Sequence, residues 1–495
     1  MTQDTTKNSS LLDDEANIDY YIDYLPDVES DDFVKVFTNL INLHQEHQVP
    51  RLELLSNYYK GKNRILTAER SGDEYRADNR VASGYADLIV TTRVGQLLGS
   101  PIGYRSEDED LAETITELND YNNIAEHDSK LFNDMAVYGR AYELVSVEND
   151  RGFPDLSLSD VMQTFVVYDT KVKPSSLFAV RYFAKVDPVD SNKIENMAII
   201  YTTDEIITYV KNSGQYELVE SEPHFFDAVP ITQYRLNSYS RGSFEPVISQ
   251  IDAYDKITSE SVNTEEEQNN PMLLIKGSID DGVTKKPSET DAEFADRKAR
   301  AKATMRKSNI LMLKTPANYD GQNADAKFLN KSFNTDNTKQ NLEQLHNAIL
   351  QFTYTPDTKD ANFAASQSGE SLKWKMISSD NVKRTQEDYF KKGIMRRYRV
   401  AANVLKITRN KSMDYDKIND IDIVFTDNTP HSETEIVSKA KALDGIVSKR
   451  TQLEIIASLT NISADDELAR MAAEAKTAAA TEATTEPSAD TTLTE

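Results

Sequence analysis

The sequence predicts a multi-domain α+β fold that is rich in helix, with a mostly antiparallel sheet in its first half and a small β-rich module in its second. Three observations lead to this fold class. Apolar residues recur at helical spacing through residues 33–138. From residue 140 to about 220 the pattern changes to short β-branched and aromatic runs separated by turn residues. Residues 245–405 then predict a helix, an insert, a second helix, a loop and a long helix.

The first segment, residues 1–32, is an acidic arm with ten acidic side chains and one lysine. Its composition predicts a solvated, disordered segment. The alternative is a docking segment that packs on a neighbouring subunit through Tyr20, Tyr21 and Tyr24.

Residues 33–244 are predicted to form the main domain, with helices first and the sheet after them. Asp31 or Asp32 caps an amphipathic helix, and Pro50 begins a second one. One face of the first helix carries Phe33, Val34, Phe37, Leu40, Ile41 and His44. Further helices are expected over 79–98, 111–119 and 124–138. The expected strands are 141–147, 164–168, 178–186, 197–201, 206–211 and 216–220.

Next come two helices that flank an insert, and each has only a narrow apolar stripe. The helix over 245–268 carries Val247, Ile251, Tyr254 and Ile257, and the helix over 333–353 carries Leu342, Leu345, Ile349 and Phe352. Such stripes are too narrow to form a core alone, so we expect the hairpin to be stabilised by neighbours, including copies of itself. The insert, 269–332, combines strands near 272–275, 310–314 and 326–329 with a charged helix near 291–306.

A polar loop over 354–370 leads into residues 371–430, which hold a long helix (about 379–405) and a return strand at 421–425. The buried side of the long helix is predicted to carry Phe390, Ile394, Tyr398, Ala401 and Leu405, and Gly393 weakens the helix and could mark a kink. Short helices follow within 431–473, at 433–443, 451–458 and 465–473. Residues 474–495, almost wholly Ala, Thr, Glu and Ser, predict a disordered tail.

The composition narrows the function. The net charge is −26 in 495 residues, which argues against a protein that grips DNA over most of its surface but not against one that DNA slides past. Cysteine is absent, so thiolate metal sites and disulfides are excluded. The sequence shows no signal peptide and no apolar run near the ~18 residues of a membrane helix. We therefore expect a soluble protein made in the cytosol.

The sequence offers no credible active site, and we expect no cofactor and no metal. His44 and His47 have a spacing that can hold a metal, but no third ligand is indicated. The run Lys60-Gly61-Lys62-Asn63 lacks the upstream glycine and the hydroxyl residue of a phosphate-binding loop.

One region is basic against this acidic background, because residues 383–411 hold ten basic and two acidic side chains. One interpretation is that this face pairs with the acidic body of the next subunit. The other is a basic collar that faces DNA in a channel, through sequence-independent backbone contacts. The candidate residues are Lys391, Lys392, Arg396, Arg397 and Arg399.

Several short runs, in this order and spacing over about residues 50–470, carry a family resemblance. They are Asn57-Tyr58-Tyr59-Lys60-Gly61, Asp78-Asn79-Arg80-Val81, Gly99-Ser100-Pro101-Ile102-Gly103-Tyr104, Asp134-Met135-Ala136-Val137-Tyr138-Gly139, Val229-Pro230-Ile231, and Thr355-Pro356-Asp357 leading to Ser368-Gly369. The chain resembles the portal proteins of tailed bacteriophages, of the type found in phages with long non-contractile tails and Gram-positive hosts.

The resemblance implies the portal fold, with its wing, stem, clip and crown. Residues 33–244 and 371–430 would be the wing, the helices over 245–268 and 333–353 the stem, 269–332 the clip, and 431–473 the crown. Residues 354–370 would be a tunnel loop that touches duplex DNA. Its candidate DNA-facing residues are Lys359, Asn362, Phe363, Ser366 and Gln367, with Lys359 as the phosphate contact.

The resemblance also implies the function, a non-enzymatic subunit of a dodecameric ring at one capsid vertex, through which double-stranded DNA is packaged and ejected. The expected partners are the terminase large subunit, a head–tail adaptor, and the major capsid and scaffolding proteins. The expected location is the virion, and the host cytoplasm during assembly. The alternatives are an enzyme of the packaging apparatus (a metal-dependent nuclease or a terminase-like ATPase) and a neck or tail adaptor ring.

Overall fold

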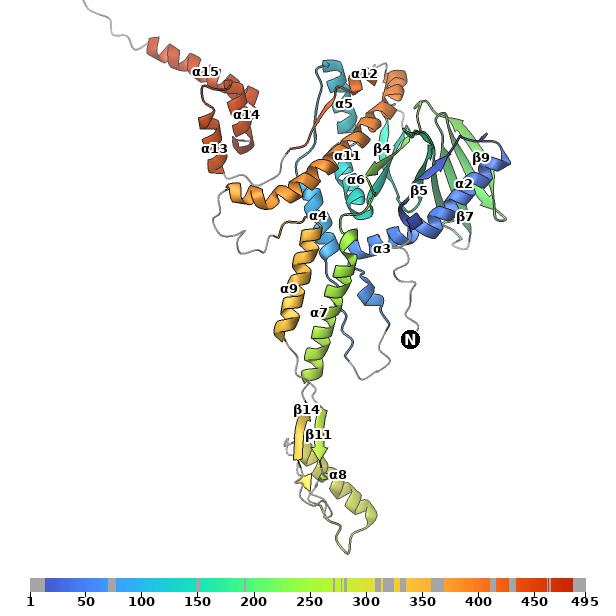
Figure 1. Ribbon diagram of the computed structural model, residues 1–495, viewed down its shortest axis with the longest axis vertical. Helices are drawn as coiled ribbons and strands as arrows, with labels where there is room; N and C mark the ends of the chain where they lie inside the picture. Colours follow the sequence, from blue (N-terminus) through green and yellow to red (C-terminus); the bar gives the residue numbers. More distant parts are fainter. Residues whose placement is uncertain are drawn as a thin grey trace, which may run out of the picture. The chain divides into compact units, whose positions relative to one another are not determined.

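The computed structural model (Figure 1) describes residues 14–69, 77–147, 152–190, 193–269, 272–276, 278–279, 283–307, 313–314, 325–329, 335–357, 369–409, 415–426, 433–460, 462 and 464–483. The chain divides into two compact units. We call Met1–Glu53, Ile89–Ser243 and Tyr354–Glu495 the body unit, and Leu54–Leu88 with Phe244–Thr353 the hairpin unit. The fold mixes helices with mostly antiparallel sheets, as predicted.

The body unit begins with η2 (Asp14–Asn17) and strand β1 (Tyr20–Ile22), which pairs in parallel with β5 (Thr164–Asp169) of the same chain. Tyr20 is buried against the Phe165 ring. The prediction of a disordered arm is therefore wrong for these residues, and Tyr20 is not available to a neighbouring subunit. Tyr21 and Tyr24 remain exposed.

Three helical segments follow without a break: α2 (Asp31–Leu43), the π-helical turn η3 (His44–Gln48) and α3 (Val49–Tyr59). The N-cap is Ser30, whose hydroxyl accepts a hydrogen bond from the Phe33 N–H (3.2 Å). The expected cap at Asp31 or Asp32 is thus wrong by one residue or two, and these carboxylates lie in the first turn. The start of the second helix at Pro50 is confirmed within one residue.

The main sheet has the strand order β1-β5-β6-β7-β8-β9, and all pairs except β1 with β5 are antiparallel. Its further strands are β6 (Ser176–Val186), β7 (Ile194–Tyr201), β8 (Glu205–Asn212) and β9 (Gln215–Pro223). All lie where the sequence predicted strands. Helix α2 covers one face of this sheet, where the Phe33 ring contacts Phe178 and the Phe37 ring contacts Tyr209.

A second sheet has the order β10-β3-β4, formed by β10 (Ile231–Arg235), β3 (Arg140–Ser146) and β4 (Asp155–Ser159). The return strand β15 (Asp422–Val424) is confirmed and pairs with β2 (Gly103–Arg105). The sequence predicted β3, but strands β2, β4 and β10 were not predicted, and none of these three is longer than five residues.

Five helices of the body unit pack on this second sheet or on each other. They are α4 (Tyr85–Leu98, which begins in the hairpin unit), α5 (Glu109–Tyr121), α6 (Ile124–Tyr138), α11 (Gly369–Arg409) and α12 (Tyr415–Ile418). The predicted buried side of α11 is confirmed, because all five of its residues have no exposed surface. The helix begins at Gly369, earlier than predicted, so residues 369–378 belong to it.

Gly393 allows α11 to lie close to strand β10. A Cβ atom at this position would lie 2.2 Å from two ring carbons of Tyr234. The space that the Tyr234 ring occupies therefore explains a glycine in the middle of this helix.

The hairpin unit contains η5 (Glu245–Val247), α7 (Ile248–Asn269) and α9 (Thr335–Phe352), and the two long helices run side by side (Figure 1). Ile251 and Ile349 are fully buried, as predicted. Phe352 is wrong as a core residue because 55% of it is exposed, whereas Leu350 is buried. The buried stripe is narrow, which confirms this part of the expectation.

An extended segment, 79–84, lies along α7 in place of the helix predicted there. Backbone N–H groups of alternate residues donate to α7 side chains one turn apart: Asn79 to Asn263 Oδ1 (2.6 Å), Val81 to Ser259 Oγ (2.9 Å) and Ser83 to Asp255 Oδ1 (2.8 Å). We call these three acceptors the α7 ladder. Two residues of an extended chain advance about as far as one turn of a helix, or about four residues. Successive α7 side chains can therefore accept from the backbone N–H groups of this segment, which have no strand partner.

The insert contains β11 (Met272–Lys276), β12 (Ser278–Ile279), α8 (Asp291–Lys307), β13 (Leu313–Lys314) and β14 (Asp325–Leu329). Strand β11 pairs with β14 and β12 pairs with β13, both antiparallel. The predicted strands and charged helix are present.

Three helices end the described chain: α13 (Glu433–Ala442), α14 (Lys449–Thr460) and α15 (Ala464–Ala483). Gln452 joins the first two by donating to the Ala440 carbonyl (3.2 Å). The disordered tail is wrong for residues 474–483, which continue α15. The high helix propensity of alanine explains why this segment of low complexity is helical. Residues 484–495 lie outside the described part.

Candidate functional site

Most of the predicted tunnel loop, residues 358–368, lies outside the described residues. Its candidate residues Lys359, Asn362, Phe363, Ser366 and Gln367 all lie outside the described residues. The described ends of the loop are Tyr354–Asp357 after α9 and Gly369 at the start of α11.

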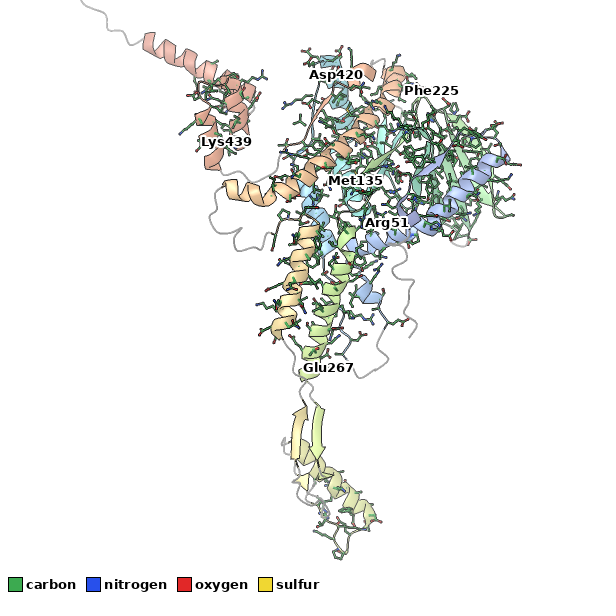
Figure 2. The ribbon with its side chains drawn as sticks, in the orientation of Figure 1. Arg51, Met135, Phe225, Glu267, Asp420 and Lys439 are labelled. Atoms are coloured by element: carbon green, nitrogen blue, oxygen red, sulfur yellow. The ribbon has the colours of Figure 1, made fainter. Side chains whose placement is uncertain are left out.

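The predicted basic face of α11 divides between two environments. Arg397 is fully buried, Lys391, Arg396 and Arg399 are partly exposed, and Lys392 is exposed. Side chains crowd this part of the body unit, which includes the labelled core residue Met135 (Figure 2).

Arg397 lies at the centre of a buried ion cluster that joins α11 to α6 and β3. Its Nε donates to Glu143 Oε1 (2.8 Å), and its Nη2 donates to Asp128 Oδ1 (2.6 Å). His127 Nε2 lies 2.7 Å from the same Glu143 oxygen. We call these four residues the Arg397 cluster.

Two tyrosine hydroxyls complete the cluster. Tyr234 donates to Glu143 Oε2 (2.7 Å), and Tyr104 donates to Asp128 Oδ2 (3.1 Å). Both carboxylates are thus held by a cation and a hydroxyl, as buried charges require.

The electrostatics keep these groups ionised. Burial alone would raise the pKa of Glu143, but the Arg397 guanidinium and the hydrogen bonds from His127 and Tyr234 hold it below its ordinary value. Burial likewise would lower the pKa of Arg397, and the Asp128 and Glu143 carboxylates raise it instead. Arg397 is therefore wrong as a residue of a channel or subunit face, because its charge is neutralised within its own chain.

Three of the other candidate basic residues of α11 border a cavity of about 830 Å³ in the body unit, which we call the basic pocket. Its walls come from α11, β10, the turn between β5 and β6, and the segment before β10. The basic side chains in its lining are Lys173, Arg235, Lys392, Arg396 and Arg399, and the one lining carboxylate is Asp227. Lys391 is not part of this lining.

Arg396 and Arg399 donate hydrogen bonds to neutral groups, and Arg235 pairs with a carboxylate. Arg396 donates to Ser176 Oγ (2.9 Å) and to the Val229 carbonyl (3.2 Å), and Arg399 donates to Asn419 Oδ1 (2.6 Å). Arg235 pairs with Asp19. Sequence analysis missed Lys173 and Arg235 because they are isolated in sequence, and only folding brings them beside α11.

The predicted histidine pair is split by the fold. His44 is buried and its Nδ1 lies 2.8 Å from the Tyr182 hydroxyl, while His47 Nε2 lies 3.3 Å from Glu15. Burial, with a smaller effect from Arg140, lowers the pKa of His44 to about 3. His44 is a neutral core residue.

Within the described ranges we find no group of three or more His, Asp or Glu side chains that could hold a metal ion. Nor does any described helix have the length and hydrophobicity to cross a membrane.

Comparison with known proteins identifies the family. The family described as "Phage portal protein, SPP1 Gp6-like" matches residues 39–481. The portal protein of Bacillus phage SPP1 is 22% identical over 443 residues, which cover 84% of this chain and 82% of that protein. The match extends through both units and the insert. The chain therefore belongs to the SPP1 Gp6-like family of phage portal proteins, and it is a structural portal subunit for DNA packaging.

Proposed function

We propose that copies of this chain form a dodecameric ring at one capsid vertex, and that double-stranded DNA is packaged and later ejected through its central channel. The α7–α9 hairpin in a chain of the portal family supports this proposal. Its buried stripe is narrow and leaves most residues of both helices partly or fully exposed, so further copies of the hairpin are the natural partners for these surfaces.

We assign the parts of the subunit to the domains of the portal fold. The two sheets with α2–α6 and most of α11 form the wing, α7 and α9 form the stem, the insert forms the clip, and α13–α15 form the crown. The clip would dock the terminase large subunit during packaging and a head–tail adaptor afterwards. The major capsid and scaffolding proteins would meet the ring during assembly in the host cytoplasm.

The loop between α9 and α11 is proposed to touch DNA. Lys359 would contact phosphates, and Asn362, Ser366 and Gln367 would form weak hydrogen bonds beside Phe363. Contacts of this kind are independent of base sequence and exchange readily, as a sliding duplex requires. Lys391, Lys392, Arg396 and Arg399 would either face DNA in the channel or pair with the next subunit.

A top-view electron micrograph of the purified protein tests the ring. We expect wide particles with a central hole, and a monomer that persists at high protein concentration with magnesium would contradict the proposal. ATPase and nuclease assays test the proposed lack of enzymatic activity. Turnover that a single carboxylate substitution abolishes would establish an enzyme instead.

Replacement of Lys359 with Ala, alongside the control Lys339→Ala on α9, tests the loop. Rings should form in both variants, and DNA retention should fall in Lys359→Ala alone.

A further inference from the structure

The basic pocket is a positively charged concave site in the body unit of this acidic chain. Five basic side chains line it, against the single lining carboxylate Asp227 and the Asp19 carboxylate that pairs with Arg235. Among the described residues, no carboxylate pairs with Lys173 or Lys392, and both lysines are exposed. A site with this balance attracts an anionic group.

The lining also carries neutral polar side chains, Thr203, Gln233 and Ser238, which can form hydrogen bonds with an occupant. Three tyrosines, Tyr21, Tyr168 and Tyr389, add aromatic walls.

The size of the pocket selects the class of occupant. A cavity of about 830 Å³ falls in the range of sites that enclose small molecules or a few residues of a peptide. A DNA duplex does not fit inside it. The matching occupant is an acidic peptide segment.

Strand β9 supplies such a segment at the other edge of the main sheet. Among the described strands it pairs with β8 alone, so its outer edge has no described strand beside it, and every residue of β9 after Tyr216 is exposed. Glu220 and Glu222 stand two residues apart on this edge and therefore point to the same side. Leu218 and Val219 are 51% and 61% exposed beside them.

The two surfaces lie at opposite edges of one sheet. Tyr21 of β1, the first strand in the order, lines the pocket, and β9 is the last strand. Five strand spacings separate these edges, about 24 Å, and Figure 1 shows β9 at the end of the sheet away from α11. Different, complementary surfaces on opposite sides of a subunit are what a head-to-tail ring contact requires.

We propose that the basic pocket of one body unit receives the Glu220–Glu222 edge of β9 from a second copy of this chain, and that this contact repeats around the ring. The inference rests on the proposed function, since it assigns one interface of the ring. It places Lys392, Arg396 and Arg399 at a subunit contact rather than facing DNA. Acidic residues on a free edge strand also hinder non-specific strand pairing, and the exchange experiment below separates that role from a specific contact.

The test exchanges the charges. Variant A carries Lys173→Glu and Lys392→Glu in the pocket, and variant B carries Glu220→Lys and Glu222→Lys on β9. All four side chains are exposed, so both variants should fold. The control is Lys60→Glu with Lys62→Glu, which makes the same charge change as variant A on two exposed lysines of the hairpin unit. Light scattering after gel filtration and electron micrographs report assembly.

We expect A alone and B alone to need at least about tenfold more protein than the wild type to form rings, because like charges would meet at every contact. An equimolar mixture of A and B should recover rings, because each A–B contact restores opposite charges. The control should assemble as the wild type does.

Three outcomes overturn the inference. If A and B each assemble as the wild type does, the pocket is not an interface, while the portal function stands. If A and B fail and their mixture fails too, the two surfaces do not meet each other. If A assembles normally but retains less DNA, the pocket serves nucleic acid instead. A wild type that forms no rings would remove both this inference and the proposed ring.

Discussion

The two units of the chain use their buried polar groups in opposite ways. In the body unit the Arg397 cluster lies inside an aromatic core, where every member of the cluster is almost fully buried. In the hairpin unit the α7 ladder holds an extended segment by bonds from side chain to backbone, over a narrow apolar stripe. The body unit is therefore stabilised by side chains buried on every side of the cluster. The hairpin unit relies on local polar contacts and leaves surface available for other subunits.

The difference indicates where the subunit can adapt. Separating a buried ion cluster inside an aromatic core costs much free energy, so the body unit should unfold as one cooperative unit. Bonds from an extended segment to a helix open at lower cost, since water can replace each acceptor. Elements of the latter kind can adjust during assembly without unfolding the domain.

The largest expected effect comes from Arg397→Met. It leaves Glu143 and Asp128 buried without their cation, so we expect the free energy of unfolding to fall by about 3–5 kcal/mol. Arg399→Met, which removes a partly exposed arginine bonded to Asn419, is the matched control and should cost under about 1 kcal/mol. Equal losses in urea-induced unfolding would mean that the cluster has no special role.

The pH dependence of stability in the wild type and in Arg397→Met follows from the direction in which the pKa of Glu143 is shifted. The pKa of Glu143 is lowered in the folded wild type, so its stabilisation is present above its unfolded pKa and is lost as the pH falls through the folded value. Without Arg397, burial raises this pKa and protonation becomes favourable. The stability gap between wild type and Arg397→Met should therefore narrow as the pH falls from 7. It narrows first as Glu143 becomes protonated in the variant, above its ordinary pKa, and then further below about pH 4.5 as the wild type loses its stabilisation. A constant gap from pH 7 to pH 4 would show that the carboxylates carry no charge.

The second effect compares two glycines in helices of the body unit. Gly393→Ala places a methyl group 2.2 Å from the Tyr234 ring, so we expect a loss of about 1–3 kcal/mol from overpacking. Gly95→Ala on α4 meets no atom within 4 Å and should gain about 0.5–1 kcal/mol from helix propensity. Thermal unfolding measures both, and a gain from Gly393→Ala would mean that α11 shifts easily.

The third effect is local to the hairpin unit. Asp255→Ala removes the acceptor of the Ser83 N–H and of Asn63 Nδ2, which donates to Asp255 Oδ2 over 2.5 Å. Two donors lose their partner, so local opening should become easier by about 1–3 kcal/mol. Hydrogen exchange at residues 79–83 should accelerate accordingly. Glu260→Ala, on the exposed side of α7, should leave this exchange unchanged.

The sequence predicted most of the long elements and few of the polar contacts. The stripe from Phe390 to Leu405 repeats at helical spacing, so its burial could be predicted directly. Arg397 falls three residues after Ile394 and four before Ala401, on the same stripe. That spacing was the available signal that Arg397 is buried, but the local basic composition obscured it.

Other features depend on contacts that a linear pattern does not contain. Strand β1 is three residues long in a very acidic segment, and its partner β5 lies more than a hundred residues away. Segment 79–84 has helical spacing, yet α7 offers its N–H groups better acceptors. The basic pocket gathers Lys173, Arg235 and α11 only after folding. Local periodicity therefore predicts the elements, while tertiary partners decide the charged sites.

The smallest effects test whether the two units unfold separately, with one Ser→Ala change in each. Ser30→Ala removes the N-cap of α2 and should lower the stability of the body unit by about 1 kcal/mol. Ser259→Ala removes the acceptor of the Val81 N–H and should raise hydrogen exchange at Val81 by about tenfold. The urea transition of the body unit should stay in place in Ser259→Ala. If this transition shifts as much as in Ser30→Ala, the hairpin unit unfolds together with the body. The α7 ladder would then stabilise the whole subunit, and the local adaptability that we assign to the hairpin unit would have to be abandoned.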